Sequence, residues 1–248
     1  MEDRSVGIEV RNLVKKFGDL LVLDDISFHV KKGDFLCVVG PTGCGKTTFL
    51  NTITTLYEPT SGSILIDGSP VDLGRNRLAY VFQEYSTMHW LNVEENVAFG
   101  LNIRRLGKEE TARRVDYVLD MVGLTPYRKY YPKQLSASML QRVVIARAFA
   151  TEPELLLMDE PYGQLDIGLR FKLEDELIQL WQKTGTTVIF ITHNIEEAVY
   201  LGEKILVLTN KPTHIKAEID NKLPRPRDIT QPEFVKIRNE ITDLIKWW

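Results

Sequence analysis

The hydrophobic and polar positions along the chain change period several times, and each period predicts one type of element. Apolar and polar residues alternate over residues 6–13 and 26–30, which is typical of half-buried antiparallel strands. Other runs are almost entirely apolar, which indicates strands buried on both faces, as in a parallel sheet. These runs lie at residues 35–39, 78–82, 155–158 and 187–192, and further strands are expected at residues 63–66, 205–208 and 215–219.

Helical spacing replaces the strand signals between residues 85 and 150. The apolar residues that recur at this spacing are Val93, Val97 and Leu101, followed by Val115, Val118, Leu119 and Val122. We therefore expect one domain over residues 1–248, in which a helical subdomain interrupts an α/β core. The core would comprise residues 1–84 and 151–220, the helical subdomain residues 85–150, and a C-terminal extension residues 221–248.

The C-terminal extension contains a basic, proline-rich link and then an apolar helical pattern. Residues 223–227 read Leu-Pro-Arg-Pro-Arg, which predicts a stiff extended segment. The apolar face of the terminal helix is formed by Phe234, Ile237, Ile241, Leu244 and Trp248. Packing of this face on its own domain is the simpler interpretation, and binding of a partner is the alternative.

Composition excludes some classes of function. The chain has 248 residues and a formal charge of -3, so it lacks the basic footprint of a nucleic-acid-binding protein, and we expect no nucleic-acid partner. No apolar run approaches the roughly 20 residues that a membrane-spanning helix needs. The first five residues are polar, so we expect no secretory signal. Any role at a membrane would therefore depend on a partner protein.

A glycine-rich loop between an apolar strand and a helix expected at residues 48–53 carries the strongest chemical signal. Gly40, Gly45, Lys46 and Thr47 satisfy the pattern G-x-x-x-x-G-K-[ST] in this context. Backbone N–H groups of such a loop and the following helix N-terminus capture phosphate, the lysine bridges the outer phosphates and the threonine hydroxyl ligates Mg²⁺. The alternative is an ordinary glycine-rich turn. The residues expected to contact the nucleoside triphosphate are Gly40, Pro41, Thr42, Gly43, Cys44, Gly45, Lys46, Thr47 and Thr48.

The two cysteines do not form a disulfide framework. Cys37 lies within an expected strand and Cys44 within the phosphate loop, which fits a reducing compartment. Cys44 is either an oxidation-sensitive brake on the site or an inert loop side chain, because a reactive thiol needs exposure and a lowered pKa.

Polar side chains follow three of the apolar strands, where ligands of open α/β sheets bind. Asp159 is suited to holding Mg²⁺, and Glu160 to orienting or deprotonating the attacking water. Gln83 could reach the metal or the water, and His193 could hydrogen-bond the γ-phosphate. Simpler interpretations remain open: Gln83 as a solvated strand end, Asp159 and Glu160 as a polar strand exit, and His193 as a satisfied or surface histidine.

Two further residues have open roles. Phe17, in an expected turn at residues 15–19, could stack on adenine or cap the local core. Ser136 precedes a helical pattern at residues 139–148, so it could help bind an anion or simply cap the helix.

Together these motifs resemble those of the ATP-binding subunits of ABC transporters over nearly the whole chain. Gln83 corresponds to the Q-loop, His193 to the switch histidine and Phe17 to the aromatic A-loop, while residues 165–166 end the D-loop and residues 135–139 stand at the family signature. The resemblance implies an α/β fold: a P-loop NTPase core with a mainly parallel sheet, an antiparallel β subdomain and an inserted helical subdomain. It also implies an ATPase with ATP and Mg²⁺ as cofactors.

The resemblance further implies a head-to-tail dimer, in which ATP lies between the phosphate loop of one chain and the signature of the other. The implied catalytic residues are Glu160, His193 and Gln83, the implied metal ligands are Thr47, Gln83 and Asp159, and Ser136, Ser138 and Asp166 join the nucleotide contacts. The signature departs from the family's Leu-Ser-Gly-Gly, since Ala137 and Ser138 replace the two glycines. Gln164 replaces the usual alanine of the D-loop.

Three stretches resemble the importer subgroup for nitrate, sulfonate, taurine and related compounds. They are residues 90–101, 131–135 and 223–227, and Met139 agrees with them. The implied partners are permease subunits, a second ATPase subunit of the same or a different kind, and a periplasmic or extracellular solute-binding protein, with the chain on the cytoplasmic face of the membrane. The alternatives are a regulatory or weakly hydrolysing subunit paired with a second ATPase, and a soluble ABC ATPase without a transport role.

Overall fold

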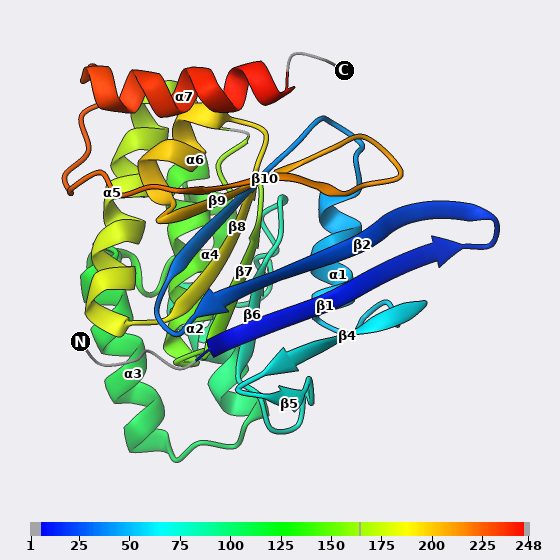
Figure 1. Cartoon of the computed structure of the whole chain (residues 1–248). Coiled ribbons are helices and arrows are strands. Elements are labelled where there is room, and N and C mark those ends of the chain that lie inside the picture. Colours follow the sequence, from blue (N-terminus) through cyan, green and yellow to red (C-terminus); the bar gives the residue numbers. More distant parts are fainter. Residues whose placement is uncertain (1–5, 164, 246–248) are drawn as a thin grey trace. The chain divides into compact units, whose positions relative to one another are not determined.

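The computed structural model describes residues 6–163 and 165–245, which fall into two compact units (Figure 1). In the described ranges, the first unit joins residues 6–76 to residues 187–245, and the second comprises residues 77–163 and 165–186. Gln164 and Trp248, both named above, lie outside the described residues. None of the helices in the described ranges is long and apolar enough to cross a bilayer.

The first unit contains an antiparallel sheet with the strand order β2-β1-β4-β5. Its strands are β1 (Val6–Phe17), β2 (Leu20–Lys31), β4 (Ser61–Ile66) and β5 (Ser69–Pro70). Glu9 of β1 pairs with His29 on one side and with Leu65 on the other. Buried and exposed side chains alternate from Ile26 to Val30, so the antiparallel pattern predicted there is confirmed.

The phosphate loop follows a strand in the mainly parallel part of the first unit. The strands of this part are β3 (Phe35–Val39), β8 (Thr187–Thr192), β9 (Lys204–Leu208) and β10 (Ile215–Asp220). β3 runs parallel to both β8 and β9, and β10 runs antiparallel to β9. Every side chain of β3 and β8 is buried, as the apolar runs predicted.

Three helices complete the first unit: α1 (Lys46–Ile53), α6 (Ile195–Leu201) and α7 (Pro232–Ile245). Helix α7, red in Figure 1, contacts α6 and β9 and buries Phe234 and Ile241. The terminal helix therefore packs on its own unit, as its apolar face predicted.

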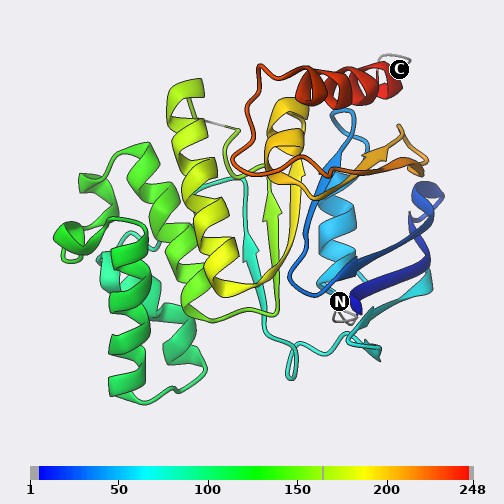
Figure 2. The same ribbon diagram turned by 60° about the vertical axis from the view of Figure 1, so that its left-hand side comes forward.

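The second unit combines a parallel strand pair with four helices. β6 (Leu78–Val81) pairs with β7 (Leu155–Asp159), and the helices are α2 (Val93–Ile103), α3 (Lys108–Met121), α4 (Ala137–Ala150) and α5 (Ile167–Thr184). α2 contacts α3 and α4, and these helices lie together in green in Figure 2. Their shared core includes Val97, Leu101 and Leu119, three of the residues that gave the helical spacing. Short 3₁₀ turns at Thr125–Tyr127 and Pro132–Gln134 connect α3 to α4.

Three local predictions were wrong. The turn expected at residues 15–19 is confined to two residues, because Phe17 pairs with Leu20 across a tight hairpin in which Gly18 has a φ of 58°. β6 is only partly buried, because it is an edge strand that pairs with β7 alone among the described strands. Helix α1 begins at Lys46, two residues before the expected start at Thr48.

Candidate nucleotide-binding site

The phosphate loop connects β3 to α1 in the first unit. Gly43 and Gly45 have φ angles of 78° and 113°, which non-glycine residues rarely adopt. Gly45 is also the N-cap of α1, and a glycine has no side chain with which to cap this terminus. Backbone N–H groups at a helix N-terminus of this kind can bind an anion.

Close packing behind the loop explains two of its glycines. A Cβ atom on Gly40 would lie 3.0 Å from Cβ of Leu208, and one on Gly45 would lie 2.9 Å from Cγ1 of Val22. Side chains at these positions would push the loop away from the strands that support it.

Lys46 is almost buried and makes hydrogen bonds within the loop. Its Nζ donates to the carbonyl oxygens of Gly40 (3.0 Å) and Pro41 (3.1 Å). The ammonium group of Lys46 therefore lies at the phosphate loop, where the sequence motif predicts it.

Cys44 is buried, with a relative exposure of 1%. Burial raises the pKa of the Cys44 thiol, and the positive charge of Lys46 only partly opposes this effect. A protonated, buried thiol is poorly nucleophilic, so the structure favours the interpretation of Cys44 as an inert loop side chain.

His193 follows β8 at the same edge of the sheet as the phosphate loop. Val39, the last residue of β3, pairs with Thr192, the last residue of β8, so Gly40 and His193 each follow one member of this pair. Asn194 then caps α6, since its side chain accepts hydrogen bonds from the backbone N–H groups of Glu196 and Glu197. An Asn between a strand and a helix is a recognisable cap signal, although Asn194 was not among the residues predicted to shape the site.

Phe17 lies at the end of the long hairpin and remains 42% exposed. Its ring meets Tyr57 edge to face at a centroid distance of 5.3 Å. Lys15 Nζ lies 4.8 Å from the ring centroid and donates to the carbonyl oxygen of Glu58. The aromatic ring is thus fixed by local contacts while part of it faces solvent.

The second unit holds the carboxylate pair and Gln83 at one edge of its strands. Val81 pairs with Met158, so Asp159, the last residue of β7, and Gln83, two residues after β6, lie at the carboxyl ends of paired strands. Asp159 is 6% exposed, and the hydroxyl group of Tyr80 donates to its Oδ2 at 3.4 Å. Tyr80 was predicted only as a strand residue, because an aromatic ring in an apolar run gives no sign of a polar partner.

Glu160 has a strained backbone. Its φ of 45° lies in the left-handed region, which costs a non-glycine residue energy and is often found where a side chain must be held in place. The carbonyl oxygen of Glu160 accepts a hydrogen bond from the N–H group of Gly163 at 3.1 Å.

The signature segment begins α4 in the same unit. Ser136 caps the helix by accepting from the N–H group of Met139 at 3.3 Å, and its Oγ lies 3.1 Å from Oγ of Ser138. The capping role considered for Ser136 is therefore present. Asp166 likewise caps α5 by accepting from the N–H group of Leu169 at 3.0 Å.

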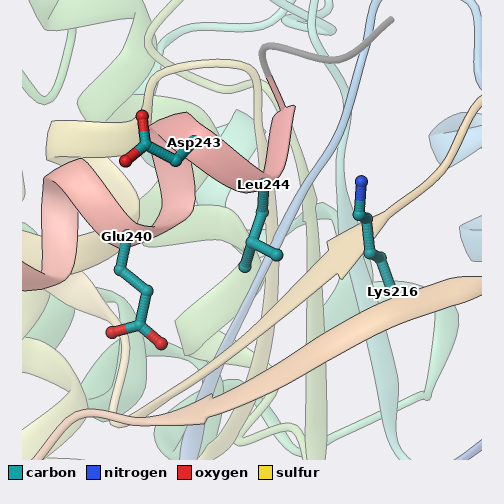
Figure 3. A pocket seen from close by; sticks show the side chains of 4 residues that line it. All are labelled: Lys216, Glu240, Asp243 and Leu244. Atoms are coloured by element: carbon teal, nitrogen blue, oxygen red, sulfur yellow. The ribbon is translucent and has the colours of Figure 1, made fainter.

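A hollow elsewhere in the first unit does not match the chemistry of a nucleotide. It lies between α7 and β10 and is lined by Lys216, Glu240, Asp243 and Leu244 (Figure 3). Two carboxylates against one ammonium group would repel a triphosphate, so the candidate site remains the phosphate loop.

Comparison with known proteins decides the family. The model of the family described as "ABC transporter" matches residues 23–163, more than half of the chain. The chain belongs to the ABC transporter family. It is an ATP-binding subunit of this family and an ATPase, and the ABC ATPase fold predicted from the sequence is confirmed.

Relatives of this ABC ATPase include import proteins. The chain is 40% identical to the nitrate import ATP-binding protein NrtD of Synechocystis sp. over 95% of its length and 92% of NrtD. It is also 40% identical to the aliphatic sulfonates import ATP-binding protein SsuB of Bacillus cereus, over 92% of this chain and 89% of SsuB.

A solved structure supports the same assignment. It is a dimeric structure of the ATP-binding cassette MJ0796 in a post-hydrolysis state, bound to ADP and Pi. Its TM-score is 0.75 with 31% identity, and the match covers 88% of this chain and all of that one.

Proposed function

We propose that this ABC ATPase hydrolyses Mg-ATP to drive an importer for a small solute of the nitrate, sulfonate or taurine type. The support is the import function named for the two relatives, each aligned over most of this chain. The chain would act at the cytoplasmic face of the membrane, bound to permease subunits. A periplasmic or extracellular solute-binding protein would deliver the solute to these subunits. The single domain over residues 1–248, with its core, helical subdomain and C-terminal extension as predicted above, is part of the same proposal.

The phosphate loop would grip the nucleotide. The observation that carries this assignment is the N-terminus of α1, which begins directly after Gly45 and three residues after Gly43, two glycines with positive φ. Backbone N–H groups, Lys46 and the hydroxyl groups of Thr47 and Thr48 would bind the phosphates, and His193 at the same sheet edge would hydrogen-bond the γ-phosphate. Phe17 would stack on adenine through the exposed part of its ring.

Asp159 and Gln83 of the second unit, together with Thr47 of the phosphate loop, are the proposed metal ligands, and Glu160 is the group that would orient water. Oxygen donors suit Mg²⁺, which usually takes one or two carboxylates together with substrate phosphates, and Asp159, Gln83 and Thr47 offer such a set. The described residues contain no cluster of three His, Cys, Asp or Glu side chains that could hold a metal ion. Mg²⁺ would neutralise charge on the phosphates, while Glu160 orients the attacking water and accepts its proton.

A complete site would need a second ATPase subunit, identical or different. In this arrangement Ser136, Ser138 and Asp166 of one chain approach the nucleotide on the other. The N-terminus of α4 would direct its partial positive charge at the γ-phosphate.

Two exposed aromatic residues mark a surface suited to the permease. Phe82 and Trp90 are 50% and 73% exposed, although large aromatic side chains are usually buried. Arg147 of α4 holds the segment between them, because its guanidinium donates to both the carbonyl oxygen and the hydroxyl group of Ser86. Movement of the helices would thus be transmitted to the segment that follows Gln83.

Two experiments test the proposal. Glu160→Gln should retain ATP binding and lose phosphate release, whereas Lys46→Ala should lose binding itself. Unchanged phosphate release by Glu160→Gln would refute the assigned chemistry. Co-purification of the chain with a membrane permease, and ATP-dependent solute uptake by the reconstituted complex, would separate the importer from a soluble ABC ATPase.

A further inference from the structure

Thr213 lies behind the phosphate loop, although it is far from that loop in the sequence. It belongs to the connection between β9 and β10 and is completely buried. Its hydroxyl group donates a hydrogen bond to the carbonyl oxygen of Cys44, 169 positions away. The same Oγ1 would lie 3.5 Å from a Cβ atom placed on Gly45, so Thr213 packs directly against this part of the loop.

The backbone of Thr213 is fixed by β2. Its N–H group donates to the carbonyl oxygen of Val22 at 2.9 Å, and its carbonyl oxygen accepts from the N–H group of Asp24 at 3.0 Å. These bonds form an isolated parallel bridge between Leu23 and Thr213. The hydroxyl group therefore projects from a firmly held position.

Peptide geometry links this hydroxyl group to the phosphate side of the loop. The carbonyl group of Cys44 and the N–H group of Gly45 belong to one planar peptide, and in the trans form they point in opposite directions. A donor that fixes the direction of the Cys44 carbonyl group therefore also fixes the direction of the Gly45 N–H group, which points to the opposite side of the peptide. A hydrogen bond to the carbonyl also polarises the peptide, which strengthens donation by its N–H group.

We propose that Thr213 is a positioning residue for phosphate binding, which aims and polarises the N–H group of Gly45 by holding the carbonyl oxygen of Cys44. The proposal rests on the function assigned above to the phosphate loop. It adds a residue outside the sequence motif, contributed by the β9–β10 connection, on which nucleotide affinity depends.

Binding of a fluorescent ADP analogue to the full chain tests the proposal. Thr213→Val removes the hydroxyl group at nearly constant shape and should raise Kd about five- to tenfold. Thr213→Ser restores the donor and should bind within about twofold of the wild type. If the additional methyl group of valine disturbs folding, Thr213→Ala should show the same rise in Kd.

Thr209 provides a matched control in the same connection. Its hydroxyl group accepts from the N–H group of His214 at 2.8 Å and donates to the carbonyl oxygen of Asn210, so it closes the turn. Thr209→Val should leave Kd within about twofold of the wild type. An equal loss of affinity in Thr209→Val and Thr213→Val would overturn the proposal, because the effect would then belong to the turn as a whole.

A spectroscopic measurement distinguishes aiming of the N–H group from general destabilisation. In ¹⁵N-labelled protein with ADP, the Gly45 amide proton should move upfield in Thr213→Val and return in Thr213→Ser, because a less polarised N–H group is more shielded. An unmoved Gly45 resonance, or an unchanged Kd in Thr213→Val, would refute the role of Thr213. If Lys46→Ala also bound ADP like the wild type, the assignment of the phosphate loop itself would fail instead.

Discussion

Replacement of Arg227 by methionine should strongly destabilise the first unit. The guanidinium group of Arg227 is buried beneath the C-terminus of α6 and donates to the carbonyl oxygens of Val199 (2.9 Å), Tyr200 (2.9 Å) and Gly202 (2.7 Å). The last carbonyl groups of a helix lack partners within the helix and carry its partial negative charge. Arg227 therefore donates hydrogen bonds to acceptors that methionine cannot satisfy, because the methionine side chain has no N–H group.

The size of the effect follows from these contacts. Hydrogen bonds to a charged group contribute about 1.5–3 kcal/mol each, but burial of the charge offsets part of that gain. Burial, followed by repulsion from Arg225, lowers the pKa of Arg227 to about 10, so the offset is substantial. Asn221 and Arg225 donate to the same three carbonyl oxygens, so none loses every partner. We expect a net loss of about 3–5 kcal/mol of unfolding free energy.

Urea unfolding followed by circular dichroism measures this loss. With a denaturant slope of about 2.5 kcal/mol/M, the midpoint should fall by about 1–2 M. Arg238→Met is the matched control, because Arg238 also joins the C-terminal extension to α6 but does so through a partly exposed ion pair with Glu196 at 3.0 Å. This variant should lose less than about 1 kcal/mol. Equal midpoints for Arg227→Met and Arg238→Met would show that the buried carbonyl contacts do not stabilise α6.

Three further predictions concern the signature segment, Cys44 and Glu110. The double substitution Ala137→Gly and Ser138→Gly should raise the steady-state ATPase rate, because the Cβ atoms it removes limit approach of the signature backbone to a phosphate; equal rates would contradict this reasoning. N-Ethylmaleimide should label Cys44 much more slowly in native than in denatured protein at pH 7, because burial raises the pKa of its thiol. The pKa of Glu110, lowered to about 2 by hydrogen bonds from Arg113 and then Arg114, should rise toward 4.5 in Arg113→Ala when followed by NMR titration. Since the folded pKa is depressed, the stabilising contribution of Glu110 is present above pH 4.5 and disappears as the pH falls through about 2.

The parts of the fold that sequence predicted best depend on local patterns. Apolar runs identified β3, β7 and β8 because strands covered on both faces are almost entirely apolar. The phosphate loop was recognisable because its glycines, lysine and threonine lie within eight residues of the chain, at residues 40–47. Polar residues that end apolar strands, such as His193, could be grouped because parallel strands align their carboxyl ends.

The parts that sequence missed depend on partners distant in the chain. The sequence of residues 223–227 predicted only a basic extended link. Arg225 and Arg227 nevertheless insert beneath α6, although arginine side chains are rarely buried. No periodicity shows which carbonyl groups such a side chain will meet. Thr213 was missed for the same reason, since one threonine in a turn gives no sign that it contacts a loop 169 positions away.

The resting hydrogen bonds of Lys46 bear on how tightly any anion is held. The ammonium group already donates to the carbonyl oxygens of Gly40 and Pro41, so its side chain is ordered before a ligand binds. An incoming phosphate therefore replaces these two acceptors. Little side-chain entropy then remains to be lost upon ligation, but every bond to the phosphate replaces one that the empty loop already had. The contribution of Lys46 to phosphate affinity is thus the difference between two sets of hydrogen bonds. Lys46→Ala should therefore destabilise the empty loop as well as weaken phosphate binding.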